Sequence, residues 1–391
     1  MKTVKFYTLG CKVNQYDTQS IRERFFSRGY KEITNGTGAG VCLINTCTVT
    51  RAADQKSRSI IRRLSRENPR ARIIVTGCLV KDHEALAGIK GIDYLIDKRF
   101  FPDGISDFSG HARAFLKIQD GCDNSCAYCK VPLVRGRSRS RPHDEIIEEA
   151  RRLACRGFKE IVLTGICLGV FGRDLIPKTS LVRLISRLEK IPGLERIRLS
   201  SIEAGDVTAG LIRKISRSRK LCPHLHIPIQ SGDDGILNKM RRKYSRKDYL
   251  DLIKRLRRKI PDIAVTTDII VGFPGESEEN FRNTLNLVKA IRPLKVHIFP
   301  YSAREGVESA GYKDEVPVNQ VKDRLERLER LNSRFSEDFR KRFKGKKVRV
   351  LFENRVAGSP DCWEGYTGNY LKVSVKSRRD LRNKLLEVIF A

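Results

Sequence analysis

Residues 115–129 read FLKIQDGCDNSCAYC, an apolar strand pattern that continues directly into a C-x3-C-x2-C loop. The thiolates of Cys122, Cys126 and Cys129 can hold three irons of a four-iron, four-sulfur cluster, which leaves the fourth iron open for a ligand. The amino and carboxylate groups of S-adenosylmethionine can chelate that iron, and an electron from the reduced cluster would then release a 5′-deoxyadenosyl radical. The alternative is a zinc site with a distant fourth ligand.

Around this loop, residues 109–343 alternate strand patterns with helical ones. The strands are expected at Phe115–Gln119, Glu160–Thr164, Arg196–Ser200, Leu225–Gln230, Ala264–Ile270 and Lys295–Phe299. Helices are expected at Asp144–Cys155 and Glu276–Ile291, and a long charged helix at Val318–Phe343 closes the region. Six such units predict a partial parallel (β/α)6 barrel, in which active groups lie on the loops after the carboxyl ends of the strands.

The first 108 residues predict a separate open parallel α/β sheet, because short apolar runs alternate there with amphipathic stretches. The strands are expected at Val4–Leu9, Val41–Asn45, Arg72–Thr76 and Tyr94–Ile96, and the helices at Tyr16–Arg28 and around Ile60, Ile61 and Leu64. Residues 101–113 lack periodicity and predict a linker to the barrel.

Three dispersed cysteines in this first region each follow a predicted strand. Cys11, Cys47 and Cys78 come after the first, second and third strands. Because the carboxyl ends of parallel strands share one edge, where ligands bind, we expect the three thiols to converge and to hold a second cluster, again with one open iron. The alternative is that they are buried small apolar residues.

The remaining cysteines are expected to pack in the core. The chain has 11 cysteines and its N-terminal residues lack the pattern of a secretion signal, so a disulfide framework is not expected. Core packing is predicted for Cys42, Cys155, Cys167, Cys222 and Cys362. No apolar run approaches the roughly 18 residues that a membrane helix needs, which predicts a soluble protein with the cytoplasm as its default location.

Residues 344–391 predict a small β-barrel. Strand patterns occur at Lys346–Glu353, Tyr370–Val375 and Leu386–Phe390. The chain carries 78 Lys and Arg against 46 Asp and Glu, a formal charge of +32 that attracts polyanions. RNA backbone would be held by Lys346, Lys347, Arg349, Lys372, Lys376, Arg378 and Arg379, and bases would stack on Trp363, Tyr366 and Tyr370.

From Leu9-Gly10-Cys11 to the C-terminus, these features resemble the radical S-adenosylmethionine methylthiotransferases. The segment Cys129-Lys130-Val131-Pro132 and the following RGRSRSRP at residues 135–142 are especially similar to that family. The resemblance implies an N-terminal methylthiotransferase domain with the auxiliary cluster at 1–108, a radical core at 109–343 and an RNA-binding TRAM domain at 344–391.

The resemblance also implies the chemistry. The radical would remove hydrogen from C2 of an adenine next to the anticodon, sulfur from the auxiliary cluster would attach there, and a second S-adenosylmethionine would supply the methyl group. The cofactors would be two [4Fe-4S] clusters and S-adenosylmethionine, contacted by Tyr128, Thr164, Gly165, Ser200, Ser201, Glu203, Gln230 and Gly272. The series Arg135, Arg137, Arg139 and Arg141 could contact phosphates or form a solvated loop.

The target is indicated by a short motif. GCKVNQ at residues 10–15 is similar to the subgroup that acts on threonylcarbamoyladenosine in ANN-decoding tRNA, with a flavodoxin or ferredoxin as electron donor. The alternatives are isopentenyladenosine in tRNA, an aspartate of ribosomal protein S12, or a non-catalytic iron–sulfur protein that binds RNA. Cys167 stands where many relatives have histidine. His224 and His226 share a strand face and are expected to be hydrogen-bonded interior residues.

Overall fold

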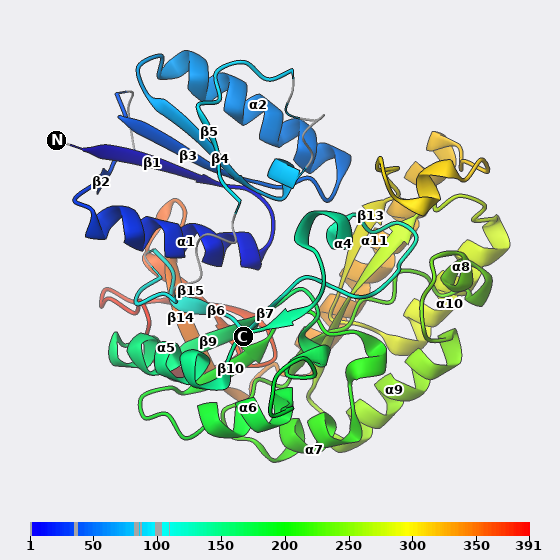
Figure 1. Ribbon diagram of the computed structural model, residues 1–391. Coiled ribbons are helices and arrows are strands. Elements are labelled where there is room, and N and C mark those ends of the chain that lie inside the picture. Colours follow the sequence, from blue (N-terminus) through cyan, green and yellow to red (C-terminus); the bar gives the residue numbers. More distant parts are fainter. Residues whose placement is uncertain (1, 35–37, 82–85, 87, 98–103, 109) are drawn as a thin grey trace. The chain divides into compact units, whose positions relative to one another are not determined.

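The computed structural model describes residues 2–34, 38–81, 86, 88–97, 104–108 and 110–391 (Figure 1). The chain forms two compact units. The first unit consists of Met1–Phe108, Asp120–Arg139 and Ser302–Ala310, and the second of Ser109–Gln119, Ser140–Tyr301 and Gly311–Ala391. The C-x3-C-x2-C loop therefore belongs to the first unit. The linker predicted at residues 101–113 lies partly outside the described residues, and the domain boundaries after 108 and 343 stay predictions.

A five-stranded parallel sheet forms the centre of the first unit, as the alternating pattern predicted (Figure 1). Its order is β2-β1-β3-β4-β5, from β1 (Thr3–Thr8), β2 (Lys31–Glu32), β3 (Val41–Thr46), β4 (Arg72–Gly77) and β5 (Tyr94–Leu95). Every residue of β3 is buried, as expected for the central strand of a parallel sheet with both faces covered. The edge strand β2 was not predicted, because two charged residues carry no alternating pattern.

Two long helices of the first unit begin at well-defined positions. Helix α2 (Arg51–Glu67) starts where the Thr50 hydroxyl accepts a hydrogen bond from the Ala53 N–H at 3.2 Å, and it buries Ile61 and Leu64 in the core. Helix α1 (Lys12–Ser27) starts four residues earlier than predicted. Its first turns bury polar residues such as Asn14 and Asp17, so the apolar periodicity that would mark its start is absent.

The second unit contains the predicted six-stranded partial barrel (Figure 1). Its strands are β6 (Arg113–Lys117), β9 (Glu160–Thr164), β10 (Arg196–Leu199), β11 (His224–His226), β12 (Ala264–Val271) and β13 (Lys295–Pro300). They form two parallel sheets, β10-β9-β6 and β11-β12-β13, which parallel bridges join between Ile197 and Leu221 and between Ser201 and His226. Strand β11 ends four residues earlier than predicted, because Pro228 has no N–H for the ladder and Gln230 takes a positive φ of 70°.

Helices alternate with these strands. The longer ones are α5 (His143–Cys155), α6 (Leu181–Leu188), α7 (Ala209–Arg217), α9 (Arg246–Lys259), α10 (Glu278–Ile291) and α11 (Val318–Lys341). The shorter elements of the chain are α8 (Asp234–Lys239) in the second unit and α4 (Val131–Arg135) in the first, and strands β7 (Gln119–Asp120) and β8 (Arg139–Ser140) pair with each other. Helices α9 and α10 begin with capping boxes at Ser245 and Ser277. Polar residues that end a loop therefore set where these barrel helices start.

The C-terminal residues form a curled antiparallel sheet, a half-barrel, in the order β16-β15-β14-β17. Its strands are β14 (Lys347–Val356), β15 (Ser359–Thr367), β16 (Lys372–Lys376) and β17 (Leu385–Ile389). Strand β15 was not predicted, because Pro360 and Gly365 weaken its strand pattern. Trp363 at the centre of β15 is 1% exposed and packs in a core with Phe339 of α11 and Phe352.

A buried ion-pair network joins the C-terminal sheet to the barrel within the second unit. Arg198 of β10 donates to Glu160 of β9 at 2.6 Å and to the carbonyl oxygens of Thr367 and Gly368. Both charged side chains are 1% exposed. The guanidinium also lies 4.1 Å from the ring centre of Tyr370, a favourable cation–π distance. The barrel strands thus provide the charge that holds the C-terminal sheet in place.

In the part of the chain that the structure describes, no helix combines the length and the apolar composition that a membrane crossing requires.

Candidate functional site

The three dispersed cysteines lie along one edge of the first unit's sheet. Cys47 and Cys78 directly follow β3 and β4, and Cys11 lies three residues after β1. These strands are neighbours in the sheet. Gly10 lies so close to Cys47 that a Cβ atom on it would be 3.1 Å from the Cys47 sulfur, and its φ of +95° also favours glycine. The structure therefore places the three cysteines after the ends of neighbouring strands, as expected, and their binding of a cluster stays a prediction.

The Cys47 thiol lies in an environment that disfavours its ionisation. Its pKa is raised to about 11, mainly by burial and to a smaller extent by Cys78 and Cys11, whereas the Val49 backbone N–H and Arg135 oppose the rise. Three thiolates at this separation repel one another in a partly desolvated site. A bound cation or metal cluster removes that repulsion, because the thiolate is the form that binds metal.

Polar side chains hold this edge in shape. The Asn14 amide of α1 donates to the carbonyl oxygens of Leu9 at 2.7 Å and Thr46 at 2.9 Å, so it ties the ends of β1 and β3 together. The Ser57 hydroxyl of α2 lies 3.2 Å from the Cys47 N–H and donates to the Cys47 carbonyl at 2.8 Å. These bonds explain why α1 buries polar residues: their partners are the strand ends that carry the cysteines.

The C-x3-C-x2-C loop folds tightly back on itself in the same unit. The Cys122 N–H donates to the Gly136 carbonyl at 3.1 Å, and the Asn124 N–H points to the Cys122 sulfur at 3.4 Å. Gly121 has a φ of +73°, and a Cβ atom there would lie 2.0 Å from the Arg137 carbonyl oxygen, so this turn requires glycine. All three cysteines of the loop are partly exposed. Their sulfurs are therefore accessible for a metal cluster.

Arg135 contacts both cysteine-bearing segments. Its side chain is 1% exposed and donates to Asp120, two residues before Cys122, at 2.8 Å. It also donates to the Asn14 side-chain oxygen, three residues after Cys11. Although burial opposes its charge, Asp120 and the thiols of Cys78 and Cys11 raise the pKa of Arg135 well above its ordinary value. A permanent positive charge thus acts on Cys11 and Cys78 and contacts Asp120 of the cysteine loop.

Neither alternative that the sequence left open for Arg135, a phosphate contact or a solvated loop, fits its buried side chain. Its side chain is committed to Asp120 and Asn14 in the interior of the first unit. Arg141 is also largely occupied, because it pairs with the buried Glu149 at 2.7 Å. Arg137, whose side chain is 96% exposed, and the exposed Arg139 have the solvent accessibility that a phosphate contact needs. The alternating arginines looked equivalent in sequence, but their burial separates them.

The chemistry of the two sets of three cysteines, one dispersed and one in the C-x3-C-x2-C loop, suits iron–sulfur clusters. Each set offers three thiols, and soft thiolates prefer iron–sulfur clusters and zinc. Three protein ligands per cluster leave one iron open, as a reacting centre requires. Arg135 and the Asn124 N–H supply positive charge and a hydrogen bond to sulfur, which are the interactions that stabilise an anionic cluster.

The predicted cofactor contacts of the barrel all lie at or just after strand ends in the second unit. Thr164 ends β9, Ser200 and Ser201 follow β10, and Gln230 and Gly272 lie beyond β11 and β12. Gly165 and Glu203 are in the loops that follow β9 and β10. Tyr128 lies in the cysteine loop of the first unit. The barrel residues therefore share the edge where ligands bind in parallel barrels.

Two of these side chains have unusual polar environments. The Ser200 hydroxyl is buried and has no hydrogen-bond partner among the described residues. Burial raises the pKa of Glu203, while its ion pair with Arg242 opposes the rise. A buried hydroxyl without a partner costs free energy unless a ligand or water satisfies it. Both groups therefore suit a polar ligand, whereas Arg242 was not found from the sequence because no motif marks it.

Two other residues are occupied within the protein. The Thr164 hydroxyl donates to the Val162 carbonyl of its own strand at 3.1 Å. The Gly272 N–H donates to Glu276 at 2.8 Å, and Glu276 is held by the buried Arg324. The sequence marked these positions by their place after strands, which does not reveal how their polar groups are satisfied.

The other cysteines divide by burial. Cys42, Cys167 and Cys222 are buried, as predicted, and Cys167 is held where its N–H donates to the Gln119 side chain at 2.8 Å. The prediction of core packing is wrong for Cys155, which is exposed at the last residue of α5. Cys362 is only partly buried. Burial at a helix end depends on what packs against it, which spacing in the sequence does not encode.

The aromatic residues of the C-terminal sheet are not free for stacking on bases. Trp363 is buried in the core. Tyr370 packs on Arg198 and accepts a hydrogen bond from Arg113 at 2.9 Å, and Tyr366 lies beside the same Arg113. The predicted stacking platform is therefore wrong for Trp363, because it lies on the inner face of the sheet. The exposed cations Lys347 and Arg349 are paired with Glu387 and Glu195 at the surface.

Comparison with known families and proteins places the chain among radical enzymes. Residues 116–288 match the radical SAM superfamily, and residues 3–96 match the uncharacterised protein family UPF0004. A Bacillus subtilis protein named threonylcarbamoyladenosine tRNA methylthiotransferase MtaB is 38% identical over 99% of this chain and 93% of its own length. The Chlamydia pneumoniae protein of the same name is 40% identical over 95% of this chain and 91% of its own length.

A relative with another target and a solved structure complete the comparison. A tRNA-2-methylthio-N(6)-dimethylallyladenosine synthase from Acetivibrio thermocellus is 35% identical over 97% of this chain and 87% of its own length. The solved radical S-adenosylmethionine methyltransferase TsrM from Kitasatospora setae has a TM-score of 0.53 at 14% identity, covering 76% of this chain and 75% of that one. At that identity the structural match shows a shared fold only.

Proposed function

Because the chain belongs to the family of radical S-adenosylmethionine methylthiotransferases, we propose that it converts N6-threonylcarbamoyladenosine next to the anticodon of tRNA into its 2-methylthio derivative. The observation that carries this proposal is the pairing of two three-thiol sets in one compact unit. The full-length similarity to relatives named for this reaction, at 38% and 40% identity, supports the target.

The first unit has the ligands for the two clusters that this chemistry needs. Cys122, Cys126 and Cys129 would hold one [4Fe-4S] cluster, and Cys11, Cys47 and Cys78 the other. When bound, such clusters supply the electron that cleaves S-adenosylmethionine and the sulfur that is inserted. The C2–H bond of adenine is not acidic, so a side-chain base could not activate it and a radical is required.

The remaining residues of the site would offset the charge of the clusters or bind and orient S-adenosylmethionine. Arg135 stays charged between the two cysteine-bearing segments and offsets their negative charge. On the barrel edge, the Ser200 hydroxyl and the Glu203–Arg242 pair would bind polar groups of S-adenosylmethionine such as the ribose hydroxyls. The further contacts proposed for S-adenosylmethionine are Tyr128, Thr164, Gly165, Ser201, Gln230 and Gly272. Of these, Thr164 would contribute through its position rather than its hydroxyl, which is already bonded.

The partner is tRNA, which the formal charge of +32 would attract over a broad surface. We expect an N-terminal methylthiotransferase domain at 1–108, a radical core at 109–343 and an RNA-binding TRAM domain at 344–391. ANN-decoding tRNAs that carry threonylcarbamoyladenosine are the expected substrates, the cytoplasm is the expected location, and a flavodoxin or ferredoxin is the expected electron donor. The target base must leave its stack to reach the reacting groups.

Nucleoside mass spectrometry tests the target. The chain is expressed in a bacterial strain that lacks its own threonylcarbamoyladenosine methylthiotransferase, and total tRNA is digested. We expect 2-methylthio-threonylcarbamoyladenosine to reappear with the wild-type chain and to stay absent with Cys122→Ala. Absence of this nucleoside with a wild-type chain that contains both clusters would refute the target.

Dimethylallyladenosine is the second candidate base, because several relatives at 34% and 35% identity are named for it. The same experiment in a strain that lacks both activities separates the two. Formation of 2-methylthio-dimethylallyladenosine without the threonylcarbamoyl product would assign the chain to that reaction. Release of 5′-deoxyadenosine by the purified, reduced protein tests the radical step independently of the base.

A further inference from the structure

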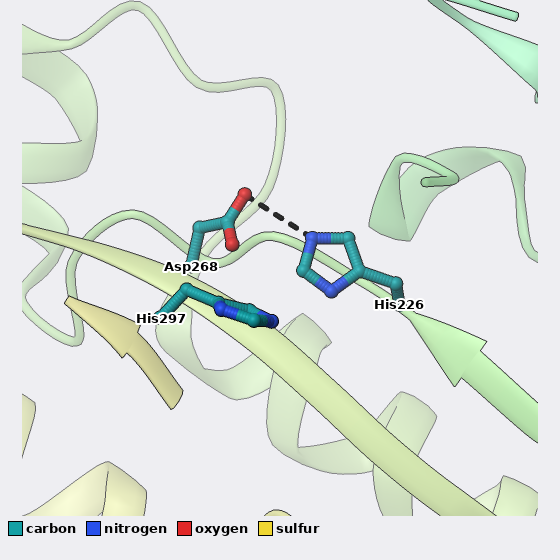
Figure 2. Close-up of side chains that lie close together, drawn as sticks. All are labelled: His226, Asp268 and His297. Atoms are coloured by element: carbon teal, nitrogen blue, oxygen red, sulfur yellow. Dashed lines mark ion pairs between the residues drawn. The ribbon is translucent and has the colours of Figure 1, made fainter. Parts of the chain in front are cut away.

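Two histidines and an aspartate meet on one face of the barrel sheet in the second unit, outside both cysteine sets. His226 ends β11, Asp268 is in β12 and His297 is in β13, which are three neighbouring parallel strands. Figure 2 shows the Asp268 carboxylate and the two imidazole rings turned toward one another. All three ligand atoms lie within 4.8 Å of one another.

Strand register creates this cluster. Asp268 is the direct cross-strand partner of His297, and Thr266 is the partner of His226. Because side chains two residues apart point to the same face of a strand, Thr266 and Asp268 project together between the two histidines. His226 alone looked like an ordinary interior histidine in the sequence. Its partners come from segments about 40 and 70 residues further along the chain, at spacings that no motif describes.

The distances suit ligands of a single metal ion. Nitrogen and oxygen ligands bind zinc at about 2.0–2.2 Å, which places two ligands of one tetrahedral ion about 3.3 Å apart. The Nε2 atom of His226 lies 3.2 Å from an Asp268 carboxylate oxygen. The His226 and His297 rings are edge to face with centres 5.5 Å apart, and the His297 ligand atom lies within 4.8 Å of the other two.

The second nitrogen of His226 supports the same interpretation. Its Nδ1 atom lies 2.9 Å from the Thr266 hydroxyl, which fixes the ring orientation and leaves Nε2 directed at Asp268. Metal-binding histidines commonly have this arrangement, in which the other ring nitrogen is held by a polar neighbour. The Thr266 hydroxyl also lies 3.2 Å from Nε2 of His224, whose ring packs instead on Tyr370 and is not part of the cluster.

We propose that His226, Asp268 and His297 bind a divalent transition-metal ion of the zinc or iron(II) class. Two imidazoles and one carboxylate are a recurrent ligand set for such ions, and three protein ligands leave coordination positions open for an oxygen or nitrogen donor. Glu203 is close enough for the charge of Asp268 to raise its pKa, so the ion would share the region of the barrel expected to contact the ribose. This site is independent of the proposed target base.

Zinc is the probe. The full-length protein with both clusters assembled is incubated with excess Zn²⁺ under anaerobic conditions and desalted, and zinc and iron are counted by mass spectrometry in the same sample. We expect about one zinc per chain in the wild type and at least tenfold weaker binding in Asp268→Asn and in His297→Gln, with iron unchanged. The exposed His111 provides the matched control, because His111→Gln should retain the zinc.

X-ray absorption at the zinc edge separates this site from stray binding to cysteines. The proposal expects nitrogen and oxygen neighbours at about 2.0–2.1 Å with imidazole scattering and no sulfur. Equal zinc in the wild type, Asp268→Asn and His297→Gln would overturn it. A sulfur-rich zinc spectrum, or no zinc in the wild type, would likewise leave His226 and Asp268 as a hydrogen-bonded pair of the barrel interior. Thermal unfolding of each variant shows whether it is folded when zinc is measured.

Discussion

Arg135 in the first unit and Arg198 in the second are both 1% exposed, yet their charges are offset by different kinds of partner. Arg198 has a carboxylate, Glu160, at 2.6 Å, two backbone carbonyl oxygens and an aromatic ring. Arg135 has Asp120 and the Asn14 amide oxygen, and much of the remaining compensation comes from thiols.

The partners of a buried arginine indicate whether its charge stabilises the fold or belongs to a candidate site. The partners of Arg198 are permanent parts of the chain, so its network is complete and holds two parts of the second unit together. The partners of Arg135 include Cys11 and Cys78, whose own charge depends on pH and on what they bind. A buried arginine beside thiols therefore indicates a site, whereas one beside a dedicated carboxylate indicates architecture.

Removing Arg198 should have the largest effect on stability. Arg198→Met leaves Glu160 buried with the more distant Arg113 and Arg196 at 3.9 Å and 3.6 Å, and should lower the free energy of unfolding by about 3–5 kcal/mol. Denaturant unfolding of the purified chain measures this. The control Arg187→Met removes an exposed ion pair and should cost less than about 1 kcal/mol. Equal effects of the two changes would show that the buried network contributes little.

The next largest effect is expected in the pH dependence of stability, and it should come from the two buried thiols Cys47 and Cys222. Burial raises the pKa of both to about 11, whereas their ordinary value is 9. The folded state therefore keeps them protonated where the unfolded state ionises, so the stability that they contribute is complete below pH 9 and is lost as pH rises to 11. Each accounts for about 2–3 kcal/mol in the cluster-free chain.

Unfolding curves at pH 8 and pH 11 check this, with Cys47→Ala and Cys222→Ala as paired variants. In the cluster-free chain, each substitution should reduce the pH dependence of the free energy of unfolding by the contribution of the thiol that it removes. After cluster assembly the contribution of Cys47 should disappear, because its thiolate is then bound, and that of Cys222 should stay. Identical behaviour of the two cysteines after assembly would contradict the placement of Cys47 in a cluster.

Arg135→Gln should have a smaller effect on stability but a selective one on metal. Asp120 loses its buried partner, at a cost of about 1–3 kcal/mol. Iron retained after desalting should fall, because the charge that offsets the thiolates is gone, whereas iron per folded chain in Arg198→Met should match the wild type. Arg137→Gln, whose side chain is exposed, is the control. If Arg198→Met lost as much iron as Arg135→Gln, the distinction between the two arginines would fail.

The smallest expected change is a twofold fall in bound iron. Replacing Cys11, Cys47 and Cys78 together by Ala should reduce bound iron from about eight to about four atoms per chain, because one of two four-iron clusters is lost. Iron analysis after anaerobic reconstitution measures it, with Cys42→Ala as a control for loss of a buried thiol outside the site. Unchanged iron in the triple variant would remove the second cluster.

Local signals in the sequence were sufficient for much of the fold. Strand β9 was predicted at the residues where it occurs, because its apolar run lies between a helix end and a strand-end Thr-Gly pair. The missed elements have a common cause. The start of α1, the strand β15 and the burial of Trp363 all depend on partners distant in the chain: strand-end carbonyls for Asn14, and the two neighbouring strands β14 and β16 for β15.

The sequence by itself determined where the thiols lie, since the C-x3-C-x2-C spacing and the cysteines after three strands give two sets of three thiols. Tertiary structure alone decided the surroundings of other polar side chains. It buried Arg135 beside the cysteines rather than in a phosphate contact, and it aligned His226, Asp268 and His297 across three strands. The physical reason is that spacing encodes local geometry, whereas register and burial arise only when distant segments pack.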